Sequence, residues 1–282
     1  MSRIVYVNGS YVTEEEAKVS VFDRAFLFGD AVYEVTAVLD GQLLDFEAHL
    51  ARLDRSLGEI ALKAPLSHQA LWALHTELIA RNEVNEGIVY LEITRGAAER
   101  DFAYPETATP TVVAFTQSRP LLANPYAETG VKIITIPEIR WKRRDIKSTS
   151  MLAQAMGKQA AKLKGAYEAW MVENGHVTEG TSSTAFILDA DGVVRTQPLG
   201  HHILPGVTRR AVLRLAKSES VRLEERPFSV TEALQAREAF MSAASAFVLP
   251  IVEIDGHKIG DGRPGPIARA FRALYIDEAR KG

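Results

Sequence analysis

Tight-turn dipeptides flanked by alternating apolar residues place the strongest constraint on the fold of this chain. An Asn-Gly pair lies inside such a pattern at residues 3–12, and an Asp-Gly pair lies inside another at 31–46. Both pairs favour the two-residue turns of β-hairpins, which join antiparallel strands. Residues 166–180 and 183–197 have a similar hairpin-like pattern. Hairpin-linked strands with helices between them favour an α+β fold over a doubly wound parallel sheet.

The remaining segments divide into expected helices, strands and one linker. Apolar residues recur at helical spacing in five segments: 47–60, 68–84, 148–165, 205–218 and 267–282. Three further segments are expected to be strands, and a fourth to pass from helix into strand: 87–96, 109–117, 130–136 and 231–244. Residues 118–130 contain two prolines, an asparagine and a glycine and show no period, which is typical of a linker. We therefore expect an N-terminal α/β domain over 1–118, an interdomain linker over 119–129 and a C-terminal domain over 130–282.

Composition narrows the class of protein. The 282 residues suffice for two modest domains, and 46% hydrophobic with 24% charged residues is typical of a soluble globular protein. A net charge of −3 gives no indication of a nucleic acid or membrane partner. The absence of cysteine excludes disulfides and thiolate catalysis. The N-terminus lacks a signal-peptide pattern and no apolar run could span a bilayer, so a cytoplasmic protein is expected.

Cations crowd the stretch RWKRRDIK, which ends at Lys147. Three of them are expected to be solvated surface cations: Lys142, Arg143 and Arg144. Ile146 suggests a buried strand end, and Ser148 or Ser150 can cap the helix that follows. Lys147 would then lie between a strand end and a helix start. Local sequence alone favours one more surface cation, because lysines are rarely buried without a reason.

Three other features have an ordinary structural explanation when each is taken alone. Glu179 follows a strand and precedes a run of hydroxyl residues, as a turn carboxylate would. The stretch LPGVTRR opens a helix, and a helix N-terminus attracts phosphate. Arg52 lies beside the apolar face of its helix, where an arginine can extend to the surface. Together with Lys147, they supply the amine, the carboxylate and the anion site that pyridoxal phosphate requires.

The chain resembles fold-type IV pyridoxal-phosphate enzymes, and most of all a D-amino acid aminotransferase. The stretches that carry this resemblance are FDRAFLFGDAVYEV, HLARL, VYLEITRG, EIRWKRRDIKS, GAYEAWMVENGHVTEGTSS, LPGVTRR and PIVEIDG. They run from near the N-terminus almost to the end. The resemblance implies a two-domain fold with pyridoxal 5′-phosphate at the domain interface and with residues 130–282 as the domain that binds it. It also implies that Lys147 is the Schiff-base lysine and that the cation run is its approach strand.

The resemblance also assigns roles to the other cofactor residues. Glu179 matches the partner of the pyridine nitrogen, and Arg52 matches the arginine that binds the phosphate. Val207 and Thr208 match the phosphate-binding helix start. Ala244 lies where the family often uses a hydroxyl residue near the phosphate, and it can donate only its backbone N–H there. In the implied ping-pong transamination Lys147 acts as a base, which a neighbouring cation such as Arg140 would assist.

Substrate recognition is implied for Tyr33, Arg100 and Phe102. Tyr33 matches an active-site tyrosine. The D-amino acid branch typically carries an Arg-x-His element in a loop that reaches over from the partner subunit, so a homodimer is expected. Arg100 matches that arginine, but Phe102 stands where histidine is expected. Phe102 is therefore either a packing residue beside a sufficient Arg100 or a mark of altered substrate class.

The expected partners are a small-molecule amino donor and a 2-oxo acid acceptor. Ala37 is small where D-amino acid enzymes often have lysine, and with Phe102 it leaves an (R)-selective amine transaminase as an alternative. Residues 33–37, YEVTA, lack the glycine and arginine usual in branched-chain aminotransferases. An aminodeoxychorismate lyase is likewise weaker, because such lyases tend to carry threonine near Val35. A catalytically silent cofactor-binding protein would not need Lys147 as a base.

Overall fold

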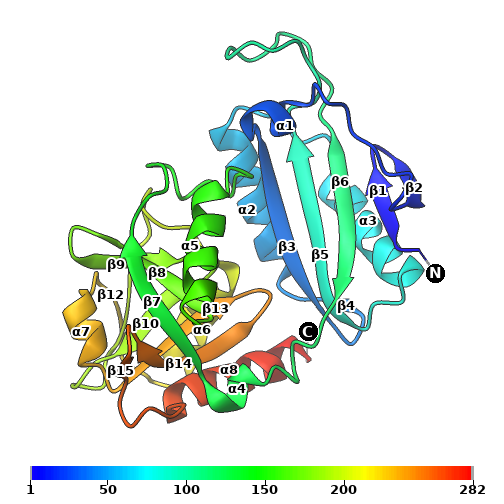
Figure 1. Cartoon of the computed structure of the whole chain (residues 1–282). Helices are drawn as coiled ribbons and strands as arrows, with labels where there is room; N and C mark the ends of the chain where they lie inside the picture. Colours follow the sequence, from blue (N-terminus) through cyan, green and yellow to red (C-terminus); the bar gives the residue numbers. More distant parts are fainter. Residues whose placement is uncertain (1, 281–282) are drawn as a thin grey trace. The chain divides into compact units, whose positions relative to one another are not determined.

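The computed structural model describes residues 2–280, which form two compact units (Figure 1). The first unit comprises the chain up to Leu121 together with Ile146–Ser150. The second comprises Leu122–Asp145 and the chain from Met151 onward. The expected C-terminal domain included Lys147, but the structure groups Lys147 with the first unit. The reason is that the buried side chain of Ile146 belongs to the apolar core of the first unit.

The first unit contains one antiparallel sheet of six strands in the order β2-β1-β6-β5-β3-β4. The strands are β1 Ile4–Val7, β2 Ser10–Thr13, β3 Ala31–Leu39, β4 Gln42–Leu43, β5 Glu86–Thr94 and β6 Val112–Ser118. The two predicted N-terminal hairpins are confirmed. Asn8 and Gly9 have φ values of 47° and 94°, and Asp40 and Gly41 have 51° and 73°. These left-handed pairs are the conformation that Asn-Gly and Asp-Gly adopt most readily.

Helices cover one face of this sheet, behind the strands in Figure 1. They are α2 Phe46–Glu59 and α3 His68–Arg81, and the short α1 Arg24–Phe28 precedes β3. Leu50, Leu53 and Leu57 of α2 are each 2% exposed, as the helical spacing predicted. β3 therefore turns alternate residues toward the helices and toward the other face of the sheet.

The second unit contains a nine-stranded mixed sheet. Its main order is β12-β11-β10-β13-β14-β7-β8-β9, and β15 pairs with β14. The strands are β7 Val131–Pro137, β8 Glu168–Glu173, β9 His176–Gly180, β10 Thr184–Leu188, β11 Val194–Thr196, β12 Leu223–Glu225, β13 Glu238–Ala243, β14 Phe247–Ile254 and β15 His257–Lys258. β7 runs parallel to both β14 and β8, whereas β8 and β9 form an antiparallel hairpin.

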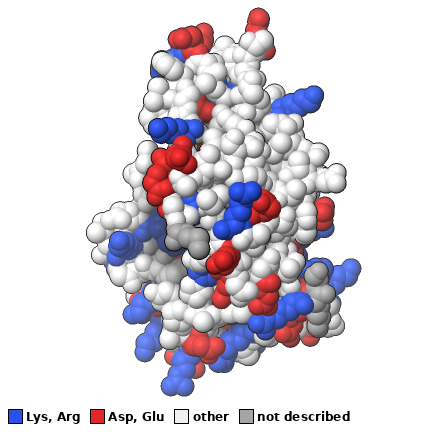
Figure 2. Space-filling model, turned by 90° about the vertical axis from the view of Figure 1, so that its right-hand side faces the viewer, with Lys and Arg blue, Asp and Glu red and all other residues white. Residues whose placement is uncertain are grey.

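Five helices belong to the second unit: α4 Tyr126–Thr129, α5 Leu152–Leu163, α6 Val207–Ser218, α7 Val230–Leu234 and α8 Pro266–Ala279. Trp170 and Phe228 are fully buried and pack edge to face in the core of the unit. No helix within residues 2–280 is long and apolar enough to cross a membrane. On the face drawn in Figure 2, acidic and basic side chains are interspersed.

The stretch before Lys147 differs from the sequence-based expectation. β7 ends at Pro137, so the buried Ile146 lies in a loop and not at a strand end. α5 begins at Leu152 with Met151 as its N-cap, and neither Ser148 nor Ser150 caps it. Within the described residues, the strand pairing of this loop is limited to one isolated β-bridge, between Ser148 and Val32. Backbone hydrogen bonds hold this loop along the edge of β3, where a continuous strand leading to Lys147 had been expected.

Candidate active site

Backbone contacts to the first unit hold Lys147. The N–H of Tyr33 on β3 donates to the carbonyl of Lys147 at 3.0 Å, and the N–H of Thr149 donates to the carbonyl of Ala31 at 3.1 Å. The N–H of Lys147 donates to Ser56 Oγ on α2 at 3.3 Å. These bonds fix the direction of the Lys147 side chain although the segment has no regular secondary structure.

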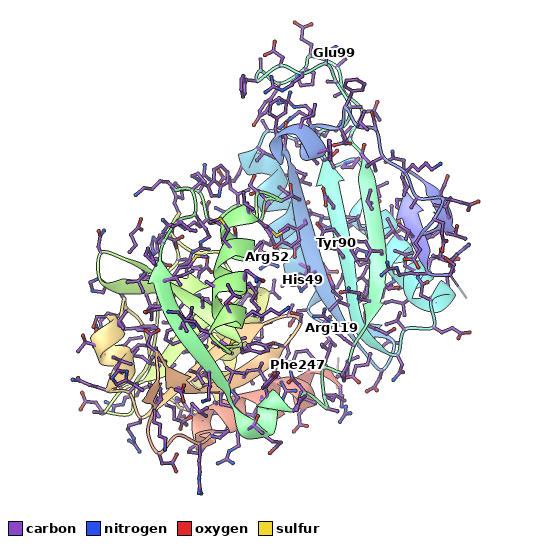
Figure 3. All side chains as sticks on the ribbon, viewed as in Figure 1. His49, Arg52, Tyr90, Glu99, Arg119 and Phe247 are labelled. Carbon is purple, nitrogen blue, oxygen red and sulfur yellow. The ribbon has the colours of Figure 1, made fainter. Side chains whose placement is uncertain are left out.

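The ammonium group of Lys147 faces the ring of Tyr33. Nζ lies 4.1 Å from the ring centroid, and the Tyr33 ring stacks on Tyr90 of β5 with centroids 5.5 Å apart. Tyr90 is labelled in Figure 3. Lys147 is partly buried, and no carboxylate within residues 2–280 pairs with its Nζ. The amine is thus held against an aromatic face and is not committed to an ion pair.

Arg52 lies in a buried ion-pair cluster with Glu34 and His49 (Figure 3). Arg52 Nε and Nη2 donate to the two oxygens of Glu34 at 2.8 and 2.7 Å, and His49 Nδ1 lies 2.7 Å from Glu34 Oε2. Burial alone would raise the pKa of the Glu34 carboxyl, but Arg52 and His49 offset it and lower the pKa to about 2. Glu34 therefore stays ionised and fixes the plane of the Arg52 guanidinium.

The loop between β5 and β6 carries Arg100 and Phe102. It extends beyond the end of the sheet, with Glu99 near its tip (Figure 3). The Arg100 guanidinium lies 5.4 Å from the ring of Phe28 and 5.5 Å from that of Phe102, which is 78% exposed. The buried Arg24 donates to the carbonyl of Asp101 at 2.6 Å and so ties the loop to the sheet.

Glu179 lies at the end of β9 in the second unit and is buried. Arg140 Nη1 donates to its Oε1 at 2.5 Å, and the backbone N–H of Leu204 donates to Oε1 and Oε2 at 3.1 and 3.2 Å. Burial raises the pKa of the Glu179 carboxyl, although Arg140 and the Leu204 N–H act to lower it. Glu179 is therefore not an ordinary turn carboxylate, because a buried guanidinium and a backbone N–H donate hydrogen bonds to it.

The cation run is only partly surface. Lys142 is 89% exposed along its side chain, as expected. Arg144, expected to be solvated, is buried and pairs with Glu173 at 3.0 Å. Arg143 is partly buried and pairs with Asp145 at 3.1 Å. Arg144 is buried because the carboxylate of Glu173 replaces the hydration that its guanidinium loses.

The start of α6 is built around Gly206. A Cβ at Gly206 would lie 2.8 Å from Thr184 Oγ1 and 3.2 Å from Arg209 Cβ, so only glycine fits without displacement. No side chain caps the helix, which leaves the N–H groups of its first turn, including Val207 and Thr208, directed outward. Thr208 Oγ1 is buried without a hydrogen-bond partner. Ala244 lies in the turn between β13 and β14.

Comparison with known proteins identifies the family. A sequence profile described as Amino-transferase class IV matches residues 31–254. D-alanine aminotransferase of Staphylococcus aureus strain MSSA476 is 37% identical over 271 residues, 95% of each chain. This chain belongs to the class IV aminotransferases. The D-alanine aminotransferase of Bacillus licheniformis is 38% identical over 267 residues, covering 94% of this aminotransferase and 93% of that one.

Solved structures agree on the fold of this aminotransferase. The branched-chain amino acid aminotransferase of Escherichia coli superposes with a TM-score of 0.90, covering 99% of this chain and 95% of its own at 24% identity. That of Thermoproteus uzoniensis, solved with norvaline, has a TM-score of 0.87, covers 98% and 94%, and is 27% identical. The two-unit fold is therefore the fold-type IV architecture, and class IV aminotransferases depend on pyridoxal 5′-phosphate.

The residues of this aminotransferase fit that cofactor. The uncapped start of α6 and the unpartnered Thr208 hydroxyl offer donors to a phosphate. The Nζ of Lys147 has no counter-ion within the described residues, as an amine that reacts with an aldehyde requires. Glu179 retains an oxygen, Oε2, whose only donor within residues 2–280 is the Leu204 N–H. The start of α6, Lys147 and Glu179 thus each retain a polar group that can bind the cofactor.

The residues that pair with the proposed cofactor-binding side chains were not predicted from the sequence. Arg140 was expected to assist Lys147, but the structure pairs it with Glu138 and Glu179. Glu34 was not singled out, although it lies on the helix-facing side of β3 among apolar residues. That position was the available signal, because a carboxylate on a buried strand face requires a cationic partner.

Proposed function

We propose that this protein is a D-amino acid aminotransferase that moves an amino group between D-amino acids and 2-oxo acids. The observation that carries the proposal is its 36–39% identity to D-alanine aminotransferases over about 95% of the chain. The solved branched-chain enzymes share its fold at 23–27% identity. Greater similarity along nearly the whole chain supports the D-amino acid branch.

When bound, pyridoxal phosphate supplies an aldehyde that condenses with an amine and a protonated ring that takes up the electron pair of the substrate α-carbon. Lys147 is the amine that holds the cofactor, and its Nζ then removes the proton of the α-carbon. Glu179 acts on the ring nitrogen. Arg52, Val207, Thr208 and the backbone N–H of Ala244 bind the phosphate.

Arg100 binds the substrate carboxylate from a loop that reaches across the dimer, and Tyr33 lines the substrate side of the site. The guanidinium of Arg100 makes no ion pair within residues 2–280 and lies near two aromatic rings, so its charge is available to a ligand. Phe102 adds no hydrogen-bond donor where the D-amino acid branch typically has histidine. The carboxylate site is therefore weaker than one with both donors, which keeps an (R)-selective amine transaminase as a second candidate.

Two substrates distinguish these activities. An arginine–carboxylate contact contributes about 1.5–3 kcal/mol, or roughly ten- to a hundred-fold in specificity. Arg100→Ala should depress turnover of D-alanine strongly and leave (R)-1-phenylethylamine, which lacks a carboxylate, nearly unchanged. Phe102→His should move the ratio toward D-alanine. Equal losses on both substrates in Arg100→Ala would make Arg100 a structural residue.

The protein acts as a homodimer in this proposal. Apolar side chains gather on the first unit in the segment around α1 and in the loop that carries Arg100, and they are at least half exposed: Val19, Val21, Phe22, Phe26, Phe102 and Tyr104. An exposed apolar group of this size favours association. We further propose a cytoplasmic location for the enzyme.

A further inference from the structure

A buried chain of charges leads to Glu179. Arg140 bridges Glu138 and Glu179, with Nη2 2.6 Å from Glu138 Oε2 and Nη1 2.5 Å from Glu179 Oε1. The three side chains are 1–5% exposed. Thr178 Oγ1 donates to Glu138 at 2.8 Å. Because Arg140 is held from both sides, its distance to Glu179 is set by the protein and not by solvent.

The buried charges of this network balance. Arg144 lies 3.6 Å from Glu138 and pairs with Glu173 at 3.0 Å. Glu173 is 31% exposed, so water and the Lys142 ammonium at 3.5 Å screen its charge. The buried groups are the guanidiniums of Arg140 and Arg144 and the carboxylates of Glu138 and Glu179. Removal of one guanidinium leaves a buried carboxylate in excess, which is unfavourable unless a cation or a proton compensates it.

A proton that compensates such a carboxylate has a defined place. Arg140 donates to Glu179 Oε1, whereas the Leu204 N–H at 3.2 Å is the only donor to Oε2 within the described part of the chain. Two charged residues act on Glu179 from the segment after β7. Arg140 lowers the pKa of the Glu179 carboxyl, and Glu138 raises it. Oε2 is therefore the open acceptor for a protonated nitrogen, and the balance between Arg140 and Glu138 decides how strongly Glu179 competes for that proton.

We propose that Arg140 determines which partner holds the proton shared between Glu179 and the cofactor's ring nitrogen. The Arg140 guanidinium keeps Glu179 ionised, so the proton remains on the nitrogen, while Glu138 opposes this effect. Loss of Arg140 moves that one proton from the nitrogen to Glu179 Oε2, and no other bond changes. Arg140 is thus a positioning residue that acts through Glu179. The inference rests on the proposed role of Glu179.

The test is the ¹⁵N chemical shift of pyridoxal phosphate labelled at the ring nitrogen, followed against pH in the holoenzyme. Arg140→Met should lower the pH midpoint at which the bound nitrogen loses its proton by about 1–3 units, the usual effect of one close charge. Glu138→Gln, which keeps the shape of its side chain, should raise the midpoint. Arg140→Lys should restore most of the loss.

A purely structural role predicts a different result. Both Arg140→Met and Glu138→Gln remove a buried hydrogen-bonded charge, so loosening of the site would move both midpoints the same way. If the midpoints of Arg140→Met and Glu138→Gln shift in the same direction, or if neither midpoint shifts, the inference is overturned. If Arg140→Met does not fold, Glu138→Gln and Arg140→Lys still decide the sign. A wild-type midpoint unaffected by Glu179→Gln would instead overturn the role of Glu179 in the proposed function.

Discussion

At the scale of single residues, several charged side chains of this aminotransferase are buried as ion pairs, and the partly buried Lys147 differs from them. Arg24 pairs with Asp30, Arg52 with Glu34 and Arg140 with Glu179, and all of these side chains are at most 8% exposed. Each pair offsets the cost of removing its charges from water. Lys147 lacks such a partner within the described residues and faces Tyr33, so its amine remains available for covalent chemistry.

Lys147→Ala should abolish turnover and leave the cofactor loosely held. Borohydride reduction of the wild type followed by peptide mapping should label Lys147. Thermal unfolding of the cofactor-free variant should hardly change, because Nζ makes only one ring contact. Lys142→Ala is the matched control, since that side chain is 89% exposed and should affect neither activity nor labelling. Label on another lysine would refute the assignment.

Glu179→Gln should cut the turnover rate by orders of magnitude with little effect on the melting temperature of the cofactor-free protein. Glutamine has nearly the volume of glutamate and can still accept from Arg140 and the Leu204 N–H. It cannot hold the ring nitrogen in its protonated form, which the reaction requires. Steady-state kinetics and calorimetry check the two expectations, and a near-normal rate in this variant would contradict the role.

The ionisation of Glu34 makes the free energy of unfolding depend on pH. Its folded-state pKa of about 2 lies below the ordinary 4.5, so the stabilisation is fully present above pH 4.5 and is lost as the pH falls toward 2. The difference corresponds to roughly 3 kcal/mol. Urea unfolding of the wild type and of Glu34→Gln at pH 7, 4 and 3 should therefore show free energies of unfolding that converge as the pH falls. A constant difference would indicate that Glu34 is not the titrating group.

At the scale of elements, short irregular segments beside regular ones supply the site residues. Lys147 is held at the edge of β3, Glu179 is the second-last residue of β9, and Val207 is the first residue of α6. Helix starts and strand ends leave backbone groups unpaired, and those groups can bind a ligand. The regular elements form the rigid frame, and the residues at or beside their ends form the proposed site.

Thr208→Val at the start of α6 should weaken cofactor binding by about tenfold, the effect of losing roughly 1.4 kcal/mol. The cofactor-free protein should be as stable as the wild type or slightly more so, because the buried hydroxyl has no partner there. Thr196→Val is the matched control. Its hydroxyl donates to the Ala185 carbonyl at 2.9 Å, so its loss should lower stability without changing cofactor affinity. Fluorescence titration measures the cofactor affinity of each variant, and thermal unfolding measures its stability.

At the scale of the whole molecule, the chain passes between its two units three times. It leaves the first unit after Leu121, returns for Ile146–Ser150 and then continues in the second. The five-residue return carries Lys147, whereas Glu179 and the start of α6 belong to the second unit.

The homodimer should dissociate when its apolar surface gains charge. Val21→Asp combined with Phe26→Asp changes two side chains that are 66% and 75% exposed, which spares the core of the unit. Sedimentation velocity should show a shift from dimer to monomer, and turnover should fall with it. Trp72→Asp places the same charge on α3 at another exposed aromatic residue and should leave the dimer intact. A monomeric wild type would contradict the proposal.

The sequence by itself determined the local features of this aminotransferase. Hairpins followed from Asn-Gly and Asp-Gly pairs, and helices followed from apolar spacing, because both depend on residues close together in the chain. The order of lysine, glutamate and helix start supported a pyridoxal-phosphate enzyme. β14 was not assigned, since its buried run of apolar residues has no alternation to reveal a strand.

Only the tertiary structure decided which charges meet. Arg144 could not be recognised as buried without Glu173, which is 29 residues away. Arg140 could not be assigned to Glu179, nor Arg52 to Glu34, because these pairs join different elements. The assignment of Lys147 to the first unit depends on pairing with β3. Local propensity acts over a few residues, whereas burial and ion pairing depend on neighbours that folding brings together from distant parts of the chain.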